Sequence, residues 1–150
     1  MRAASTFAIT DLVPHAGPMC LLDRVIDAGD EYLVAEVTVR ADGLFADGSG
    51  VGAWVGIEYM AQAVAAWAGW RARNGGGAPR IGLLLGSRRY ASTRARFTVG
   101  QCLRIEVSRT FIADNGLGQF DCRIVDDGSI VASAALNVYE PDDPAEFLRH

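Results

Sequence analysis

Lysine is absent from the chain: all 14 basic residues are arginine, and 18 acidic residues bring the formal net charge to -4. An acidic balance of this kind disfavours broad binding to nucleic acid. The N-terminus also lacks an apolar stretch followed by a small-residue cleavage site. The sequence therefore predicts no secretory signal and a cytoplasmic location.

Cysteine is scarce, with three residues at positions far apart in the chain: Cys20, Cys102 and Cys122. Their number is odd, and they lack the close pairs of a metal-binding motif. We therefore expect reduced, buried thiols and no metal site.

Histidine is scarcer still, with two residues in the whole chain. His150 ends a polar tail, which makes it a poor candidate for catalysis. His15 lies between Pro14 and Pro18, and prolines restrict the backbone of the residues beside them. The sequence therefore makes His15 the candidate catalytic imidazole.

The longest apolar stretch, residues 51–70, predicts a helix that is buried on nearly every side. Glu58 and Gln62 interrupt it, and several small residues lie between them, so a membrane span is not expected. These two polar residues are four apart and share one face of the helix. A carboxyl group in such surroundings is costly unless it is paired or used, which makes Glu58 a candidate site residue.

Alternating apolar residues predict strands on both sides of this helix, at 31–40, 81–90, 101–113, 118–126 and 129–140. A further short strand follows the proline segment and can pair with 31–40 as a hairpin. Asp126, Asp127 and Gly128 form a strong hairpin turn signal. The chain length and its 50% hydrophobic content predict one domain, residues 1–150. We expect an α+β fold in which an antiparallel sheet wraps around one long central helix and keeps an open edge for a second chain.

Two segments carry a family resemblance: LVPHAGPMCLLDRV at residues 12–25 and IEYMAQ at residues 57–62. Together they make the chain similar to the hotdog-fold 3-hydroxyacyl-[acyl-carrier-protein] dehydratases of fatty-acid synthesis, and in particular to the branch associated with aryl polyene and related polyketide clusters. The chain departs from the fatty-acid branch before the helix. The sequence LFADGSGVGAW stands there in place of a Gly-His-Phe-Pro loop and a Pro-Gly pair.

The resemblance implies a reaction and the groups that perform it. His15 is expected to be the base that removes a proton from C2, and Glu58 the acid that protonates the C3 hydroxyl or orients water. The two groups are expected to come from different chains of a homodimer or of a heterodimer with a related hotdog subunit. The substrate is expected on the phosphopantetheine arm of an acyl carrier protein, and no cofactor is required.

Other residues are candidates on physical grounds. The first N–H groups of the helix, around Ala53 and Trp54, lack intrahelical partners and are predicted to stabilise the thioester oxygen. Gln62 is predicted to hold the Glu58 carboxyl by a hydrogen bond. A group of arginines is predicted to dock the acidic carrier protein: Arg88, Arg89, Arg94 and Arg96.

Two alternatives stay open at the level of sequence. A hotdog acyl thioesterase uses the same scaffold and a carboxylate on the same helix, but directs water at the carbonyl. The chain can also be a non-catalytic partner subunit of a heterodimeric dehydratase. The sequence leaves the acyl length, an aryl or alkyl substrate, and the type of dimer undecided.

Overall fold

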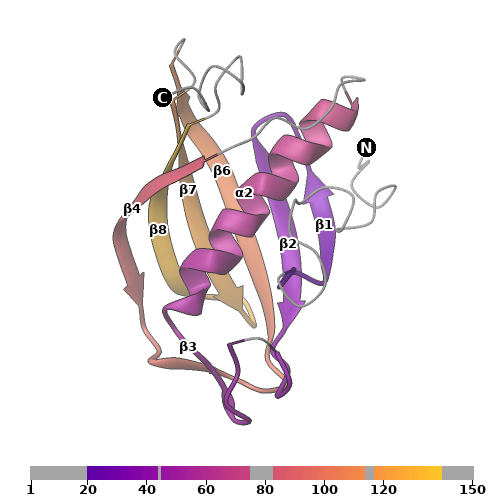
Figure 1. Ribbon diagram of the computed structural model, residues 1–150, viewed down its shortest axis with the longest axis vertical. Coiled ribbons are helices and arrows are strands. Elements are labelled where there is room, and N and C mark those ends of the chain that lie inside the picture. Colours follow the sequence, from indigo (N-terminus) through magenta and orange to yellow (C-terminus); the bar gives the residue numbers. More distant parts are fainter. Residues whose placement is uncertain (1–19, 44, 75–82, 114–116, 140–150) are drawn as a thin grey trace, which may run out of the picture.

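The computed structural model describes residues 20–43, 45–74, 83–113 and 117–139. One long helix lies across one face of a six-stranded antiparallel sheet, and two short strands form a separate pair beside its beginning (Figure 1). The elements are β1 (Arg24–Ala28), β2 (Tyr32–Thr38), β3 (Gly50–Gly52), α2 (Val55–Asn74), β4 (Leu83–Ser92), β5 (Arg96–Thr98), β6 (Cys102–Ile112), β7 (Leu117–Asp126) and β8 (Ser129–Tyr139). This arrangement confirms the predicted α+β class.

Helix α2 begins and ends four residues later than the stretch 51–70 predicted. Val51 does not belong to the helix because it pairs with Phe97 in the small β3–β5 sheet. These two strands of three residues each were not predicted. Among the described residues, no helix combines the length and hydropathy needed to cross a membrane.

The core is one cluster that joins α2 to the sheet. Met60 and Ala63 are fully buried, and the Trp67 ring meets Phe120 of β7 edge to face, with ring centroids 5.2 Å apart. The Trp67 indole N–H also donates to the Gly29 carbonyl at 3.1 Å, because a buried indole needs an acceptor. The apolar face of the helix is thus buried against one face of the sheet.

The order of strands in the large sheet is β1-β2-β6-β7-β8-β4. The predicted β1–β2 hairpin is confirmed, and so is the turn between β7 and β8, where Asp126 pairs with Ser129. Asp127 and Gly128 both have positive φ there, at 50° and 82°. This is the backbone that a two-residue hairpin requires, and Asp-Gly adopts it readily.

The two edges of the sheet are β1 and β4, and each pairs with one other described strand. Among the described strands, β1 and β4 therefore have the open edges that the sequence predicted. The prediction for the cysteines is partly wrong. Cys122 is buried and Cys20 half-buried, but Cys102 is exposed because it begins β6 on the outer side of the sheet.

The first turn of α2 has room for glycine but not for a larger residue at position 56. A Cβ atom there would lie 2.4 Å from the Tyr90 hydroxyl and 2.9 Å from Cδ1 of Ile124. We expect Gly56→Ala to lower the free energy of unfolding, because overpacking costs about 1–3 kcal/mol and the gain in helix propensity is about 1 kcal/mol at most.

Urea unfolding of Gly56→Ala, Tyr90→Phe and the double variant measures this contact. Tyr90→Phe removes the nearest atom, so the double variant is expected to be more stable than the sum of the two single effects. Strictly additive effects would contradict the proposed clash.

Candidate active site

Glu58 lies in the first turn of α2 and is half-buried. Oε1 of Glu58 accepts a hydrogen bond of 3.1 Å from Nε2 of Gln62, one turn further along the helix. Gln62 has no exposed surface, and its Oε1 accepts the backbone N–H of Leu21 at 2.8 Å. The amide of Gln62 therefore links the Glu58 carboxyl to the segment that precedes β1. The sequence predicted the bond to Glu58 but not the bond to Leu21.

The bond from Leu21 also fixes which way the Gln62 amide points. Since Oε1 faces the Leu21 N–H, the NH₂ group faces Glu58, and an NH₂ group donates but does not accept. Oε1 of Glu58 must therefore be an acceptor, and a proton on this carboxyl belongs on Oε2. In this arrangement Glu58 can act as an acid whose proton is on one defined oxygen, Oε2.

The beginning of α2 corrects one predicted donor. The N–H of Ala53 donates to the Ala95 carbonyl at 2.9 Å, so it is not available to a substrate oxygen. The N–H groups of Trp54 and Val55 have no acceptor in the described part of the chain. They lie at the positive end of the helix dipole and can receive a developing negative charge.

Tyr90 holds this helix start from the side of the sheet. Its hydroxyl donates a short hydrogen bond to the Ala53 carbonyl, which also accepts the Gly56 N–H at 2.9 Å. Burial raises the pKa of Tyr90, so its hydroxyl stays protonated as a donor. Sequence reasoning missed Tyr90, since its partner lies 37 residues away.

The Trp54 side chain is 62% exposed although it lies beside the free amides. Its indole covers Gly52, where an added Cβ would come within 2.6 Å of Nε1, and it meets Phe45 edge to face at 5.3 Å. An exposed indole packed on Phe45 leaves an apolar surface at the helix start.

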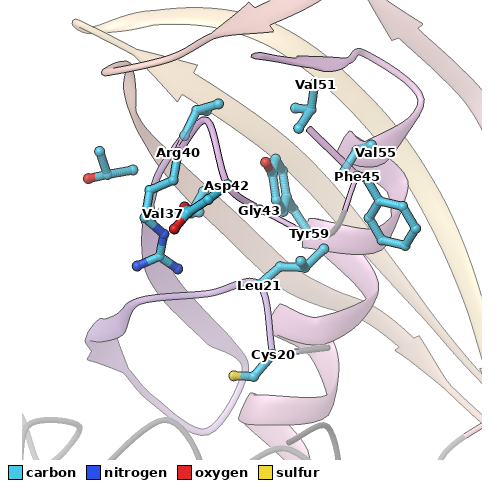
Figure 2. Close-up of a pocket in the computed structure, with 12 residues that line it drawn as sticks. Cys20, Leu21, Val37, Arg40, Asp42, Gly43, Phe45, Val51, Val55 and Tyr59 are labelled. Atoms are coloured by element: carbon cyan, nitrogen blue, oxygen red, sulfur yellow. The ribbon is translucent and has the colours of Figure 1, made fainter. Parts of the chain in front are cut away.

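A cavity of about 350 Å³ lies beside the first two turns of α2 (Figure 2). Its described walls come from α2, from β2 and the loop that follows, from β3, and from the segment before β1. They are Cys20, Leu21, Val37, Thr38, Val39, Arg40, Asp42, Gly43, Phe45, Val51, Val55 and Tyr59. The volume is at the lower end of the range for small-molecule sites.

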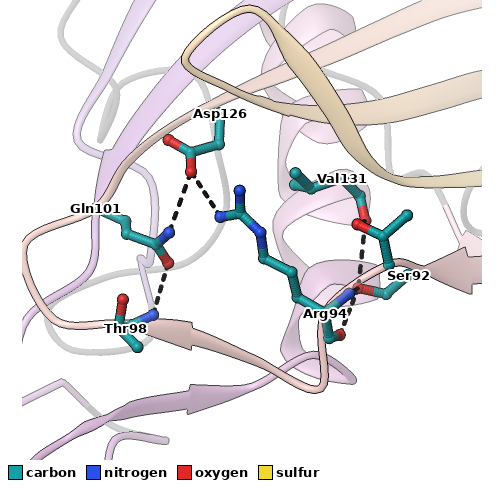
Figure 3. A network of polar contacts seen from close by, with 7 residues as sticks. Ser92, Arg94, Thr98, Gln101, Asp126 and Val131 are labelled. Atoms are coloured by element: carbon teal, nitrogen blue, oxygen red, sulfur yellow. Dashed lines mark hydrogen bonds and ion pairs between the residues drawn. The ribbon is translucent and has the colours of Figure 1, made fainter.

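Three of the four arginines predicted to dock a carrier protein have described side chains, and these three have separate surroundings. Arg94 bonds Asp126 at 2.6 Å, within a network that Gln101 extends to the backbone N–H of Thr98 (Figure 3). Arg96 pairs with Asp47 at 2.6 Å and lies opposite Gly52, next to the helix start.

The other two arginines are on β4. Arg89 lies in an outer groove that also contains Glu106 and Asp121, and its φ is 55°. The Arg88 side chain falls outside the described residues. Of the arginines whose side chains the structure describes, Arg96 is therefore the predicted docking residue that lies next to the start of α2.

His15 also lies outside the described residues, so the predicted pair of His15 and Glu58 stays a prediction. Among the described residues, no group of three or more His, Cys, Asp or Glu side chains is arranged to hold a metal ion. The described part of the site thus consists of the Glu58 carboxyl, the two free amides and the cavity.

The buried amide of Gln62 makes a measurable prediction. Gln62→Leu leaves the Leu21 N–H without its acceptor, and we expect the free energy of unfolding to fall by about 1–3 kcal/mol. Gln119→Leu, the same change on the outer side of β7, is the matched control and should change stability by about 0.5 kcal/mol or less. Equal urea midpoints for the two variants would contradict a structural role of the Gln62 amide.

Comparisons with known proteins agree with this geometry. A family model described as ApeP-like, ApeP dehydratase, matches residues 7–149. The chain is similar to the dehydratase heterocomplex ApeI:P from Xenorhabdus doucetiae, with 32% identity and a TM-score of 0.85 over 95% of this chain and 96% of that one. A search of curated proteins gave no match.

More distant structures share the fold alone. A hypothetical thioesterase with coenzyme A from Streptococcus pneumoniae TIGR4 has 12% identity and a TM-score of 0.62 over 78% of this chain and 84% of that one. The PaaI protein of E. coli has 19% identity and a TM-score of 0.60 over 77% and 81%. The predicted hotdog fold is thereby confirmed, and the family model and the heterocomplex together establish that the chain belongs to the ApeP-like dehydratase family.

Proposed function

We propose that this chain removes water from a 3-hydroxyacyl thioester carried on acyl carrier protein and gives the trans-2-enoyl product, in aryl polyene or related polyketide biosynthesis. The observation that carries the proposal is the Glu58 carboxyl, held by the fully buried Gln62 in the first turn of α2 of a dehydratase-family chain. A carboxyl group with one defined acceptor oxygen is suited to deliver a proton from the other.

The reaction needs a base, an acid and donors for the thioester oxygen. In the proposed mechanism the His15 imidazole takes the proton from C2, and the electrons of that bond form the C2–C3 double bond. Glu58 gives its proton to the C3 hydroxyl, the C3–O bond breaks, and water leaves. His15 ends protonated and Glu58 ionised, and exchange of protons with solvent restores both.

The N–H groups of Trp54 and Val55 are the proposed donors for the thioester oxygen. They replace Ala53, whose N–H donates to Ala95. Negative charge grows on this oxygen as the C2 proton leaves, and two amides at a helix N-terminus favour that charge. Trp54 contributes its amide here and its exposed indole as an apolar wall.

We propose that the site is completed by a second, related hotdog subunit. The similar structure from X. doucetiae is a heterocomplex, and β4 of this chain has an unpaired side among the described strands. In such a dimer, His15 of one chain would serve the carboxyl group of the other. A non-catalytic role for this chain within a heterodimer is the alternative that the heterocomplex keeps open.

The test is turnover of a 3-hydroxyacyl carrier protein, followed by mass spectrometry of the carrier, with the chain alone and with its partner subunit. Loss of one water from the arm is expected. Because a general acid or base contributes about a hundredfold or more, His15→Ala and Glu58→Gln should each abolish the site to which the residue belongs. Release of the free acid would instead identify a thioesterase.

The size of the loss distinguishes the assemblies. In a heterodimer with two shared sites, each single variant should keep about half of the activity and the double variant should lose all of it, because each residue serves a different site. In a homodimer, co-expressed His15→Ala and Glu58→Gln chains should recover part of the activity through mixed dimers. Full activity in the double variant heterodimer would show that this chain is not catalytic.

Carrier docking gives a further prediction at Arg96. Its pair with Asp47 is exposed on both sides, so Arg96 can exchange that carboxylate for one on an acidic carrier. Arg96→Glu is expected to raise KM for the carrier-bound substrate by about threefold or more and to leave KM for a small thioester unchanged. Arg104→Glu, an exposed arginine on the outer side of β6, is the control. Equal effects of both variants would contradict the role of Arg96.

A further inference from the structure

Asp126, the last residue of β7, holds two side chains from the connection between β4 and β6 with one carboxylate oxygen (Figure 3). Its Oδ2 accepts Nη1 of Arg94 at 2.6 Å and Nε2 of Gln101 at 3.1 Å. The Asp126 side chain is 17% exposed and the Arg94 side chain 35%. A partly buried hydrogen bond between charged groups is stronger than a pair fully exposed to water. The carboxylate therefore ties this connection to the β7–β8 hairpin.

The two side chains come from opposite ends of β5. Arg94 precedes the strand and Gln101 follows it. Oε1 of Gln101 also accepts the N–H of Thr98, the last residue of β5, at 2.6 Å. The backbone of Arg94 is fixed as well, because the Ser92 hydroxyl accepts its N–H at 3.2 Å and donates to its carbonyl at 2.7 Å. One carboxylate thus holds both ends of a short strand.

Strand β5 needs such support because its own pairing is small. It has three residues and pairs with β3 alone among the described strands. An isolated pair of strands is marginally stable at best in water. Phe97 anchors the middle of β5 in the core and has no exposed surface, but Arg96 and Thr98 on either side of it are exposed. The ends of the strand therefore depend on the contacts to Asp126.

The end of β5 that Arg94 holds lies next to the start of α2. Ala95 follows Arg94, and its carbonyl accepts the N–H of Ala53 at 2.9 Å. The next two residues, Trp54 and Val55, carry the N–H groups proposed as donors to the thioester oxygen. Donors of this kind act only when they are held in place, and a displacement of about 1 Å can cost about a hundredfold in rate. The position of Ala95 therefore affects those donors directly.

Resting on the proposed function, we propose that Arg94 and Asp126 are positioning residues for the N–H groups at the start of α2. Their ion pair fixes Ala95, whose carbonyl holds the backbone immediately before those groups. Neither side chain touches the substrate or transfers a proton. Arg94 thus serves the reaction from within the fold and not by docking the carrier protein.

The first test is hydrogen exchange of single amides, measured by NMR without any substrate. Arg94→Met removes the ion pair, and we expect the Ala53 N–H to exchange about tenfold faster or more, because its acceptor on Ala95 is held less firmly. Arg94→Lys keeps a positive donor for Asp126 and should restore most of the protection. The N–H of Ala63, in the buried middle of α2, reports global unfolding. Equal acceleration at Ala53 and Ala63 would show a global loss of stability alone and overturn the proposal.

Arg123→Met is the matched control for the exchange test. It breaks an ion pair on the same strand as Asp126, between Arg123 and Glu106 at 2.5 Å, on the outer side of the sheet. This variant should leave the exchange rate of the Ala53 N–H within about twofold of wild type, because an exposed pair contributes little to stability. If Arg123→Met accelerates exchange at Ala53 as much as Arg94→Met does, the effect is not specific and the proposal fails.

Turnover with the partner subunit distinguishes positioning from docking. In a heterodimer, His15→Ala in this chain silences the other site, so the remaining activity reports on the site that contains Glu58. In a homodimer the comparison is made with His15 in place. Arg94→Met should lower kcat about tenfold and leave KM for the carrier-bound substrate within about twofold, because the loss concerns charge that grows only in the transition state. A raised KM with unchanged kcat would identify docking and overturn the proposal.

The two readouts separate this inference from the proposed reaction. If the wild-type protein does not dehydrate a 3-hydroxyacyl thioester, the proposed function fails, while faster exchange at Ala53 in Arg94→Met still supports the role of the ion pair at the start of α2. If the wild-type protein dehydrates the thioester and Arg94→Met changes neither the exchange nor kcat, the proposed function stands and this inference is wrong.

Discussion

The structure depends on how an almost wholly apolar helix accommodates one fully buried amide. In the described part of the chain, Gln62 is the one buried polar residue of the core. Both ends of its amide need partners, since a buried donor or acceptor without one costs about 1–3 kcal/mol. Leu21 supplies the donor on one side and Glu58 the acceptor on the other. The same bonds that make burial of Gln62 tolerable fix the carboxyl and the segment before β1 relative to α2.

The second constraint is at the beginning of α2. One N–H group there is bonded to a neighbouring strand connection, and the next two have no acceptor among the described residues. The Ala95 carbonyl accepts the N–H of Ala53, and the Tyr90 hydroxyl donates to the Ala53 carbonyl, so Ala53 is held from two sides. Gly56 keeps the space that the Tyr90 hydroxyl needs. Trp54 and Val55 are thereby held at fixed positions, and no described residue accepts their amides. The proposed stabilisation of a developing charge requires pre-organised donors of this kind.

Much of this could be predicted from the sequence because its signals are periodic or local. The apolar run, the alternating strands and the Asp-Gly turn each predict one element, and the four-residue spacing of Glu58 and Gln62 predicts their bond. The short strands β3 and β5 give no such signal, since three residues are too few to show a period. Because β3 pairs with β5, the helix begins four residues later than the sequence predicted. The error at Ala53 has the same origin, because its acceptor, Ala95, is 42 residues away and no pattern links the two.

The sequence did not predict the cavity beside α2 or the residues that line it. Val51, Val55 and Tyr59 read as core positions of an apolar stretch, and their burial agrees with that interpretation. The sequence does not show that the described residues leave a cavity between α2 and the loop after β2, or that Tyr59 lines it. Whether a buried residue faces packing or a cavity depends on the distance between elements, and that distance is set by long-range contacts.

The largest exposed apolar side chain among the described residues lies at the start of α2, although Phe111 and Ile130 of the sheet are also exposed. On the outer side of the sheet, cross-strand ion pairs such as Arg24 with Glu36 and Arg123 with Glu106 keep the surface solvated. At the helix start the opposite holds, because a Trp54 indole that is 62% exposed lies beside two amides that no described residue accepts. Exposed aromatic surface is unfavourable in water and favourable under a cover. In the proposed mechanism, a chain that covers Trp54 would also exclude water from the reacting groups.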